Sequence, residues 1–285
     1  MRARYDPDFV DFLMRIGNGE KPKNEKYEIE LPQPMLIPYT TLEGSIENLI
    51  SYVYPDLNLF ETSPFEMMQR IILCPKNDFV DDINLKLIQR IPGDDIVYIS
   101  DDRARNAPDQ GDYVDYLNSL EPKGLPQHRL VLKVNCPIIL LRNINPVEGL
   151  CNGTRLICKQ LTPNLVGAVI ATGQLKGKHV WIPRIPLEPN PSDNKYLIPF
   201  IRRQFPLRLY FAITINKAQG QTLDCVGIYL RQPVFSHGQL YVALSRAKTG
   251  KKVKVLMIPA MTTDAGTKYT TNVVYDEVLA KASLT

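Results

Sequence analysis

Residues 214–222, Thr-Ile-Asn-Lys-Ala-Gln-Gly-Gln-Thr, decide the fold together with the apolar segment 207–213 that precedes them. Segment 207–213 has the length and the aromatic and β-branched content of a buried strand in a parallel sheet. The polar residues of 214–222 therefore stand at the point where that strand ends. Because α/β proteins bind ligands at strand ends, we expect an α/β fold with a ligand site here.

A second stretch, residues 241–247, is Tyr-Val-Ala-Leu-Ser-Arg-Ala and follows a loop marked by Pro233 and Gly238. At helical spacing, Gln239 and Arg246 come about two turns apart on related faces. Basic residues continue from 248 to 254, and the ordinary interpretation of such a run is a solvated face. We expect a short helix with an arginine near its end.

Two amphipathic helices and one βα unit are predicted in the first third of the chain. Asp6 and Pro7 supply a helix cap and a first-turn proline, and apolar residues then recur at i, i+3, i+4 and i+7. A second amphipathic helix is expected over residues 42–53. Residues 70–74 form an apolar strand, and residues 79–87 repeat apolar side chains at helical spacing, which completes one βα unit of a parallel sheet.

Two segments in the middle of the chain, residues 93–126 and 130–185, differ in composition from the first third. Residues 93–126 are acidic, polar and interrupted by proline, so we expect an exposed excursion; a calcium loop is the functional alternative, but the spacing matches none. Residues 130–185 consist of short β-type runs separated by glycine turns, which predicts a small antiparallel barrel. The parallel sheet is expected to resume at Leu207.

Composition bounds the class of protein. The chain has 285 residues, 44% of them hydrophobic, and a net charge of +4, which is a weak indication of a polyanionic partner. No apolar run approaches the roughly 20 residues of a membrane span, and no signal-peptide core is present. The five cysteines lack the paired spacing of zinc sites. We expect reduced, buried cysteines, no metal site and no membrane.

Residues 214–222 and 241–247 resemble motifs V and VI of superfamily-one DNA helicases. The closest resemblance is to the PIF-type (petite integration frequency) helicases and their relatives in Helitron transposons. It extends over nearly the whole chain, including residues 140–143, 149–156, 182–185, 202–207 and 233–240. The resemblance implies a RecA-like second motor domain, 2A, that carries an inserted SH3-like β-barrel, 2B. The implied boundaries are 1–125 for the first part of 2A, 126–200 for 2B and 201–285 for the rest of 2A with motifs V and VI.

The resemblance also implies a nucleotide site. The motif VI arginine, Arg246, would reach the γ-phosphate of ATP, an effect worth ~10³ to 10⁵ in rate, and Arg2, in the tail of motif IV, would face the nucleotide as a second catalytic arginine. Gly220 and Gln221 would form the motif V turn, where a glycine lets the backbone approach phosphates. The alternatives are a solvated arginine and a glycine that merely ends a turn. ATP and Mg²⁺ are the implied cofactors, with the Mg²⁺ ligands expected in a first motor domain.

Contacts to single-stranded DNA are implied for residues whose side chains donate hydrogen bonds to phosphates. Many cellular members carry histidine where Asn216 stands, which weakens a proton-transfer role here. Asn before a periodic run is more commonly a helix cap, which is the alternative for Asn77, and a tyrosine such as Tyr241 is more often a core residue. Trp181 either stacks on a base or belongs to the barrel core. The implied DNA-binding residues are Thr214, Asn216, Lys217, Gln219, Gln239, Tyr241, Lys76 and Asn77.

No Gly-x-x-x-x-Gly-Lys-Ser/Thr run occurs in the sequence, so the loop that cradles ATP phosphates is absent from these residues. We expect the C-terminal part of a nuclear, ATP-dependent 5′–3′ DNA helicase that needs a first motor domain in cis or in trans. The alternatives are a non-catalytic single-stranded DNA-binding module and a transposon-derived relic. Nothing in the residues chooses among telomere maintenance, repair, recombination and transposition.

Overall fold

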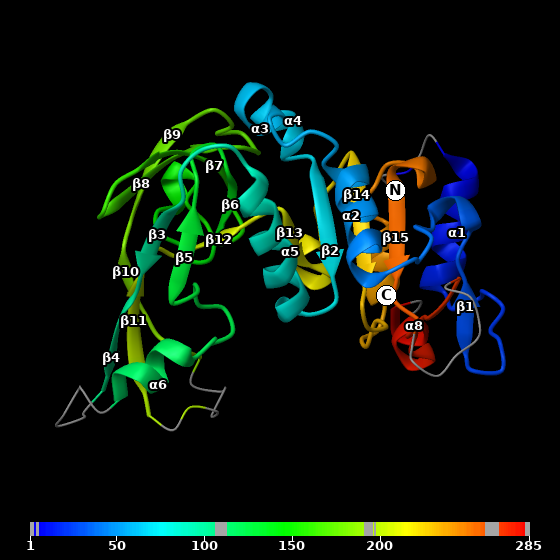
Figure 1. The fold of residues 1–285 in the computed structure, drawn as a ribbon. Helices are drawn as coiled ribbons and strands as arrows, with labels where there is room; N and C mark the ends of the chain where they lie inside the picture. The colour runs from blue at the N-terminus through cyan, green and yellow to red at the C-terminus, as the bar shows by residue number, and fades with distance from the viewer. Residues whose placement is uncertain are drawn as a thin grey trace. The chain divides into compact units, whose positions relative to one another are not determined.

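The computed structural model describes residues 3, 6–105, 113–190, 196, 198–259 and 268–282 (Figure 1). The predicted catalytic residue Arg2 lies outside this described part. The chain divides into two compact units. Unit 1 comprises Met1–Leu57, Gln69–Asn84 and Phe211–Thr285, and unit 2 comprises Asn58–Met68 and Leu85–Tyr210.

Unit 1 is built on a four-stranded sheet in which every neighbouring pair is parallel. Its strands are β2 (Arg70–Cys74), β13 (Ala212–Thr214), β14 (Cys225–Leu230) and β15 (Val253–Met257), in the order β13-β2-β14-β15. Parallel pairing brings the carboxyl ends of the strands to one edge of the sheet. This sheet confirms the predicted α/β class and the predicted strand at 70–74.

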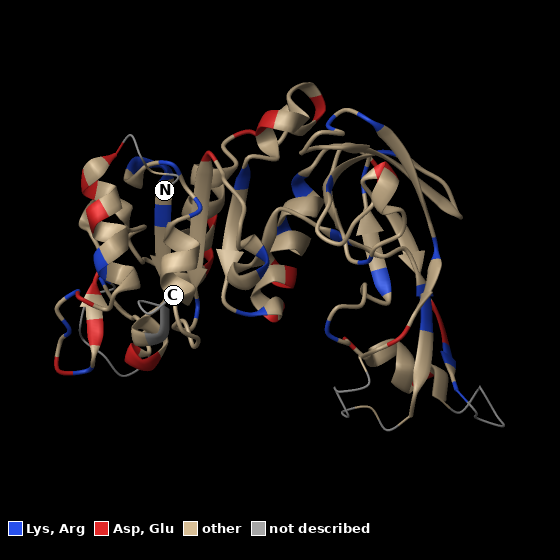
Figure 2. Cartoon of the chain, turned by 180° about the vertical axis from the view of Figure 1, so that it is seen from behind, with Lys and Arg blue, Asp and Glu red and all other residues tan. Residues whose placement is uncertain are grey.

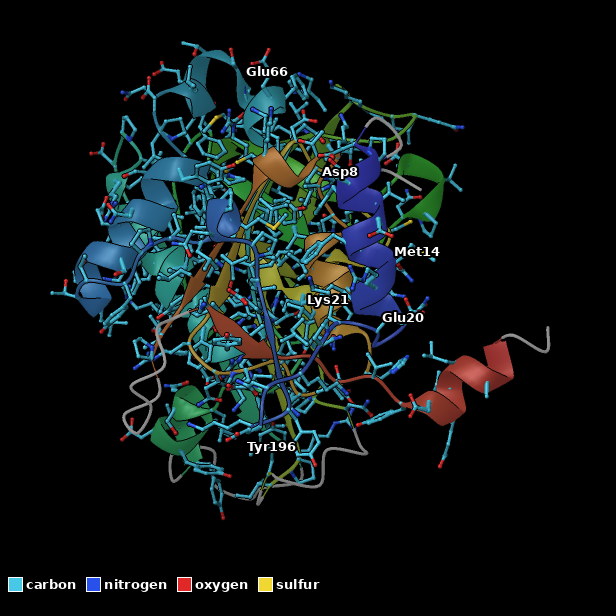
Figure 3. The ribbon with its side chains drawn as sticks, turned by 90° about the vertical axis from the view of Figure 1, so that its right-hand side faces the viewer. Asp8, Met14, Glu20, Lys21, Glu66 and Tyr196 are labelled. Atoms are coloured by element: carbon cyan, nitrogen blue, oxygen red, sulfur yellow. The ribbon has the colours of Figure 1, made fainter. Side chains whose placement is uncertain are left out.

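The helices of unit 1 follow the predicted patterns closely. In α1 (Pro7–Gly17), Asp6 caps the first turn by accepting a hydrogen bond from the Phe9 amide at 3.2 Å. Figure 3 shows Asp8 and Met14 on the outward face of this helix, both exposed. The other helical elements of the unit are η1 (Gln33–Met35), α2 (Leu42–Val53), η5 (Ile215–Ala218), α7 (Gln239–Leu244), η6 (Gly250–Lys252) and α8 (Asp276–Ala282). A short antiparallel pair, β1 (Glu28–Glu30) with β16 (Tyr269–Thr271), completes the unit.

Close packing of α2 on the sheet depends on one glycine. A Cβ atom at Gly227 in β14 would lie 2.7 Å from Val53 Cγ2 and 3.0 Å from Leu49 Cδ1. Both of these α2 side chains are fully buried. The absence of a side chain at residue 227 therefore lets the helix lie directly on the strand.

Unit 2 contains three antiparallel sheets and short helices. The largest sheet has the order β12-β6-β7-β8-β9, the second β10-β11-β4, and the third pairs β3 with β5. The strands are β3 (Ile96–Ile99), β4 (Asp101–Ala104), β5 (Arg129–Leu132), β6 (Pro137–Leu140), β7 (Arg155–Leu161), β8 (Leu165–Ile170), β9 (His179–Pro183), β10 (Ile185–Leu187), β11 (Phe200–Gln204) and β12 (Leu207–Leu209). The helical elements are α3 (Leu59–Thr62), α4 (Pro64–Met67), α6 (Val114–Ser119) and η3 (Pro146–Glu148), while α5 (Asn77–Arg90) begins in unit 1 and ends in unit 2.

The short β-runs predicted between residues 130 and 185 are confirmed as strands, and they are antiparallel. Within the described residues the ladder runs from β12 to β9, and no pairing joins these two strands. Closure into an SH3-like barrel therefore stays a prediction.

The prediction of one continuous strand over residues 207–213 is wrong. β12 pairs antiparallel with β6 in unit 2, whereas β13 pairs parallel with β2 in unit 1. The amide of Tyr210 bonds to Pro137 O, while Phe211 O accepts a bond from the Ile72 amide. Both sheets require buried apolar residues, so the composition of this run does not reveal that it serves two sheets. Unit 2 accordingly reaches from Leu85 to Tyr210, wider than the predicted insert of residues 126–200.

The prediction of an exposed excursion at residues 93–126 is wrong in part: many of the described side chains are exposed, but the segment also forms regular elements with buried residues. In this segment β3 pairs with β5, while β4 and α6 are held by Arg202, whose ion pair with Asp102 has both side chains 0% exposed. Arg202 Nη2 lies 2.7 Å from Asp102 Oδ2, and the same guanidinium donates to Leu117 O and Leu120 O at 3.1 Å. The partner that buries Asp102 is 100 residues away in the chain, so the local acidic composition did not indicate it.

Candidate nucleotide and nucleic-acid interface

Two of the predicted strand-binding segments meet at the carboxyl edge of the parallel sheet. Thr214, the last residue of β13, is the register partner of Cys74, the last residue of β2. Lys76 follows β2, and Asn216 and Lys217 follow β13; all three side chains are exposed or partly exposed. The geometry therefore brings together residues 76–77 and 214–217, which are well separated in the sequence.

The start of β13 is fixed by a buried amide. Asn84 Oδ1 accepts hydrogen bonds from the amides of Phe211 at 3.1 Å and Ala212 at 2.9 Å, and its Nδ2 donates to Ala212 O at 3.2 Å. Tyr54 Oη adds a bond to Phe211 O at 2.8 Å. Because β13 is only three residues long, these bonds reinforce its pairing with β2 in fixing the position of Thr214.

Gln239, at the start of α7, lies beside the end of β13. Its side chain is 2% exposed; Oε1 accepts from the Phe235 amide at 3.0 Å, and Nε2 donates to Asn216 Oδ1 at 3.4 Å. Gln239 therefore orients the exposed Asn216. Tyr241 lies against α1, since a Cβ atom at Gly17 would come 3.2 Å from its ring, which favours a packing role for this residue.

A tight turn follows η5. The amide of Gln221 donates to Ala218 O at 3.1 Å, and Gln221 Nε2 donates to Lys217 O at 3.2 Å. Gly220 has a φ of +85°, a conformation that residues with a Cβ rarely adopt, and an added Cβ would meet nothing within 4 Å. Gln219 and Gly220 are exposed on this turn. The backbone geometry, and not crowding, explains the glycine.

Arg246 fixes this turn through hydrogen bonds to its backbone carbonyls. Its Nη1 donates to Ala218 O and to Gln221 O, both at 3.2 Å, and its Nε donates to Val242 O at 2.7 Å. Nη2 lies 2.7 Å from Ser245 Oγ, and the whole residue is 3% exposed. The interpretation of Arg246 as a solvated helix arginine is therefore wrong: the guanidinium bridges the end of α7 to both carbonyls that flank the Gln219–Gly220 turn.

The predicted residues fall into two groups at opposite ends of the sheet. Gln239 and Asn216 lie at the carboxyl edge, where β13 has just ended. Arg246 O accepts the Leu223 amide at 3.0 Å two residues before β14 begins, which places Arg246 toward the amino edge. The segment 216–223 and helix α7 thus run side by side between the two groups.

Comparison with known proteins shows which helicases the chain is similar to. The model of the DNA helicase Pif1, 2B domain, matches residues 115–161, which lie within unit 2. The ATP-dependent DNA helicase PIF1 of Danio rerio is 32% identical over 193 residues, covering 65% of this chain and 27% of the relative. The ATP-dependent DNA helicase RRM3 of Saccharomyces cerevisiae is 51% identical over 55 residues, 19% of this chain and 8% of the relative. The chain is homologous to PIF-type superfamily-one helicases.

Solved PIF-type structures share the fold over the full length of the chain. The Pif1 helicase of Candida albicans matches with a TM-score of 0.63 at 22% identity, covering 100% of this chain and 58% of the solved one. Bacteroides Pif1 bound to single-stranded DNA matches with a TM-score of 0.60 at 19% identity, covering 100% and 54%. The chain therefore has the fold of PIF-type motor domains and spans little more than half the length of these relatives.

Two groups near the carboxyl ends of β2 and β14 are held neutral. Burial raises the pKa of the Cys74 thiol, and the charges of Asp82 and Asp81 raise it further. Burial likewise raises the pKa of Tyr229 to about 12. In the part of the chain that the structure describes, no three His, Cys, Asp or Glu side chains are grouped to hold a metal ion. The described residues thus do not fit a Mg²⁺ site, and no described helix is long and apolar enough to cross a membrane.

Sequence reasoning missed Asn84, which positions β13. The signal was present: Asn84 lies four residues from Val80 and four from Ile88, both buried, so it sits on the inner face of α5. A polar side chain on a buried face must find hydrogen-bond partners, and here these are the backbone groups of residues 211 and 212.

Proposed function

We propose that this chain is the second motor domain, with its 2B insert, of an ATP-dependent 5′–3′ DNA helicase that moves along single-stranded DNA. One observation carries the proposal. The guanidinium of Arg246, the predicted γ-phosphate contact, bonds directly to the carbonyls on either side of the turn at Gly220, which contains the predicted DNA-binding residue Gln219. Homology to ATP-dependent DNA helicases supports it.

The exposed polar groups at the carboxyl edge suit a phosphate backbone. Thr214, Asn216, Lys217 and Gln219 offer hydroxyl, amide and ammonium donors, which bind phosphate oxygens without regard to base sequence. Lys76 adds a second ammonium group on the neighbouring strand end. Binding at this edge would therefore be non-specific in sequence and weakened by salt.

Arg246 would link nucleotide and strand. Its Nη1 donates to two neutral carbonyls, whereas a phosphate would add full charge–charge attraction and accept two parallel bonds from the guanidinium. A γ-phosphate in reach of the guanidinium would therefore compete with Ala218 O and Gln221 O. Arg246 would then loosen its hold on the turn, and Lys217 and Gln219 would change position with it.

Hydrolysis needs groups that these 285 residues do not supply. The phosphate-cradling glycine-lysine run is absent from the sequence, and the described residues offer no Mg²⁺ ligand cluster. Bound ATP and Mg²⁺ would supply the reacting phosphoryl group and its charge neutralisation. A first motor domain, in cis or in trans, would hold them, and this chain by itself would hydrolyse ATP negligibly.

The test joins this chain to the first motor domain of a PIF1 relative and measures ATP hydrolysis with and without single-stranded DNA. We expect DNA-stimulated hydrolysis that Arg246→Ala lowers by ~10³ or more. Lys248→Ala is the matched control, because Lys248 is a neighbouring, exposed cation paired with Asp224 at 2.6 Å. Hydrolysis that Arg246→Ala leaves undiminished would contradict the proposal.

A non-catalytic strand-binding module is the second candidate, favoured by the polar donors at residues 216–219. It would bind single-stranded DNA equally well with and without nucleotide after the fusion above. The 5′–3′ direction, nuclear location, link to Helitron transposons and role in repair, recombination or telomere maintenance stay predictions.

A further inference from the structure

Positive charge is concentrated in one segment of unit 2. Residues 149–187, which include β7, β8 and β9, contain no aspartate or glutamate. They contain five basic residues, while the whole chain has a net charge of only +4. Figure 2 shows the blue of lysine and arginine on the strands of this unit. The five are Arg155, Lys159, Lys176, Lys178 and Arg184.

Most of this charge is not neutralised by protein carboxylates. Lys159 Nζ donates to the amide oxygen of Asn135 at 2.6 Å, and Arg184 Nη1 donates to the backbone carbonyl of Ile99 at 2.6 Å. Lys176 lies over the ring of Phe65. Among the described residues only Lys178 of the five has an ion-pair partner, Glu148 at 3.3 Å, and that pair is solvent-exposed. The segment therefore presents uncompensated positive charge to an anionic partner.

A large aromatic side chain lies in the middle of this segment. Trp181 in β9 is 50% exposed, so the interpretation of Trp181 as a barrel core residue is wrong. Its register partner in β8 is Gly167, which in turn pairs with Gln160 in β7. A Cβ atom at Gly167 would lie 3.0 Å from Trp181 Cζ3 and 3.1 Å from Gln160 Cβ. The indole thus rests on the glycine backbone and is supported from one side.

The surroundings of Trp181 leave its other side accessible. β9 is the last strand of its sheet in the described part of the chain. His179, two residues away on the same face, is exposed, and so is Leu165 at 40%. A flat indole on an open sheet edge, in a segment that carries five cations and no carboxylate, has the two components of single-strand recognition, a stacking platform and attraction to phosphates.

We propose that the β7–β9 segment of unit 2 is a single-stranded nucleic-acid binding surface, in which Trp181 stacks on a base and the five cations contact the backbone. This surface is separate from the residues 214–222 of unit 1. Stacking is indifferent to base identity, so the surface accepts any sequence. It offers contacts to a strand in addition to those proposed for residues 214–219 of unit 1.

Trp181 is the only tryptophan of the chain, so intrinsic fluorescence reports directly on this site. The experiment titrates the full chain with a thymidine oligonucleotide, an abasic oligonucleotide of equal length and a uridine oligoribonucleotide. We expect the thymidine strand to quench Trp181 and the abasic strand, which has phosphates but no bases, to leave it unquenched. Quenching by the uridine strand would extend the partner class to RNA.

Substitutions give a second, independent measure of affinity, read by anisotropy of a labelled strand. Trp181→Ala is expected to weaken binding by roughly 5- to 150-fold, while Trp181→Phe keeps a stacking ring and most of the affinity. Tyr27→Ala is the matched control, because Tyr27 is an aromatic residue of unit 1 that is 77% exposed.

The outcomes separate this proposal from the proposed function. If the strand binds with no change in fluorescence and Trp181→Ala binds normally, the proposal is overturned, while a loss in Lys217→Ala would uphold the unit 1 site. If Trp181→Ala weakens binding and Lys217→Ala does not, the proposal holds and the unit 1 site fails. If the chain binds none of the strands, both the β7–β9 surface and the unit 1 site are contradicted. The exposed Trp181 would then be interpreted as a contact for a protein partner.

Discussion

Arg246 performs a structural task that its motif alone did not reveal. The guanidinium is buried, and its donors meet the carbonyls of residues 218, 221 and 242. A buried cation is tolerated only when hydrogen bonds replace its hydration. The predicted catalytic arginine is therefore also the group that defines the shape of the turn at Gly220 when no phosphate is present.

Arg246→Ala should loosen that turn in this chain, without nucleotide or DNA. Two carbonyls lose a charged donor, and such bonds are worth about 1.5 to 3 kcal/mol each. We expect faster amide hydrogen exchange at residues 219–223 and a lower free energy of unfolding in urea. Lys248→Ala, which removes an exposed ion pair, should change the free energy by less than about 1 kcal/mol. Unchanged exchange in Arg246→Ala would show that the clamp does not order the turn.

At the scale of elements, unit 2 joins strands through a buried polar network. Asp102 of β4 pairs with Arg202 of β11, and His128, just before β5, lies close to the carboxylate of Asp102. His128 Nδ1 lies 2.8 Å from Ser100 Oγ and 3.8 Å from Asp102 Oδ2. These contacts tie the three-stranded sheet to the β3–β5 pair within the unit.

The network makes the stability of unit 2 sensitive to acid. Burial lowers the pKa of His128 from its ordinary value of 6.5, with Arg202 lowering it further and Asp102 acting in the opposite direction. Below pH 6.5 the unfolded chain binds a proton more readily than the folded one, so the free energy of unfolding falls as the pH drops through this window. The loss is complete once the pH lies below the pKa that His128 has in the folded chain.

Urea unfolding at pH 7.5 and pH 5.5 would measure this effect. We expect a smaller loss on acidification in His128→Gln than in the unaltered chain. His179→Gln, at an exposed histidine of β9, is the control and should behave like the unaltered chain. Equal losses in all three would rule out His128 as the acid-sensitive group.

At the scale of the molecule, cations are placed on both units although the net charge is small. Lys76 and Lys217 belong to unit 1, and the acid-free segment 149–187 belongs to unit 2. Phosphate contacts release condensed counterions, so each contact adds about 0.7 to the slope of log affinity against log salt for a single strand.

Salt titrations of strand binding should therefore resolve the two sets of contacts. We expect Lys217→Ala and Lys176→Ala each to lower the slope by about 0.7, as measured by anisotropy of a labelled oligonucleotide. Lys268→Ala, which removes a lysine paired with Glu30 at 3.0 Å, should leave the slope unchanged. A slope that neither Lys217→Ala nor Lys176→Ala alters would place the phosphate contacts elsewhere.

Elements whose signals are local could be predicted from the amino-acid sequence alone. The capped helix at Asp6, the helix at residues 42–53, the strand at 70–74 and the helix after it follow from caps and periodicity within one element. The two motifs at 214–222 and 241–247 also indicated the resemblance to PIF-type helicases. These features were predictable because each depends on residues within a few positions of one another.

Only the tertiary structure decided which distant groups meet. It divided the apolar run 207–213 between two sheets, buried Asp102 against Arg202, exposed Trp181 over Gly167 and placed Arg246 behind the turn at Gly220. The local composition does not reveal these contacts. A buried strand needs a partner strand and a buried charge needs an opposite charge, and both partners lie elsewhere in the chain. Hydrogen bonding and packing between those partners, and not local propensity, set the geometry of the candidate site.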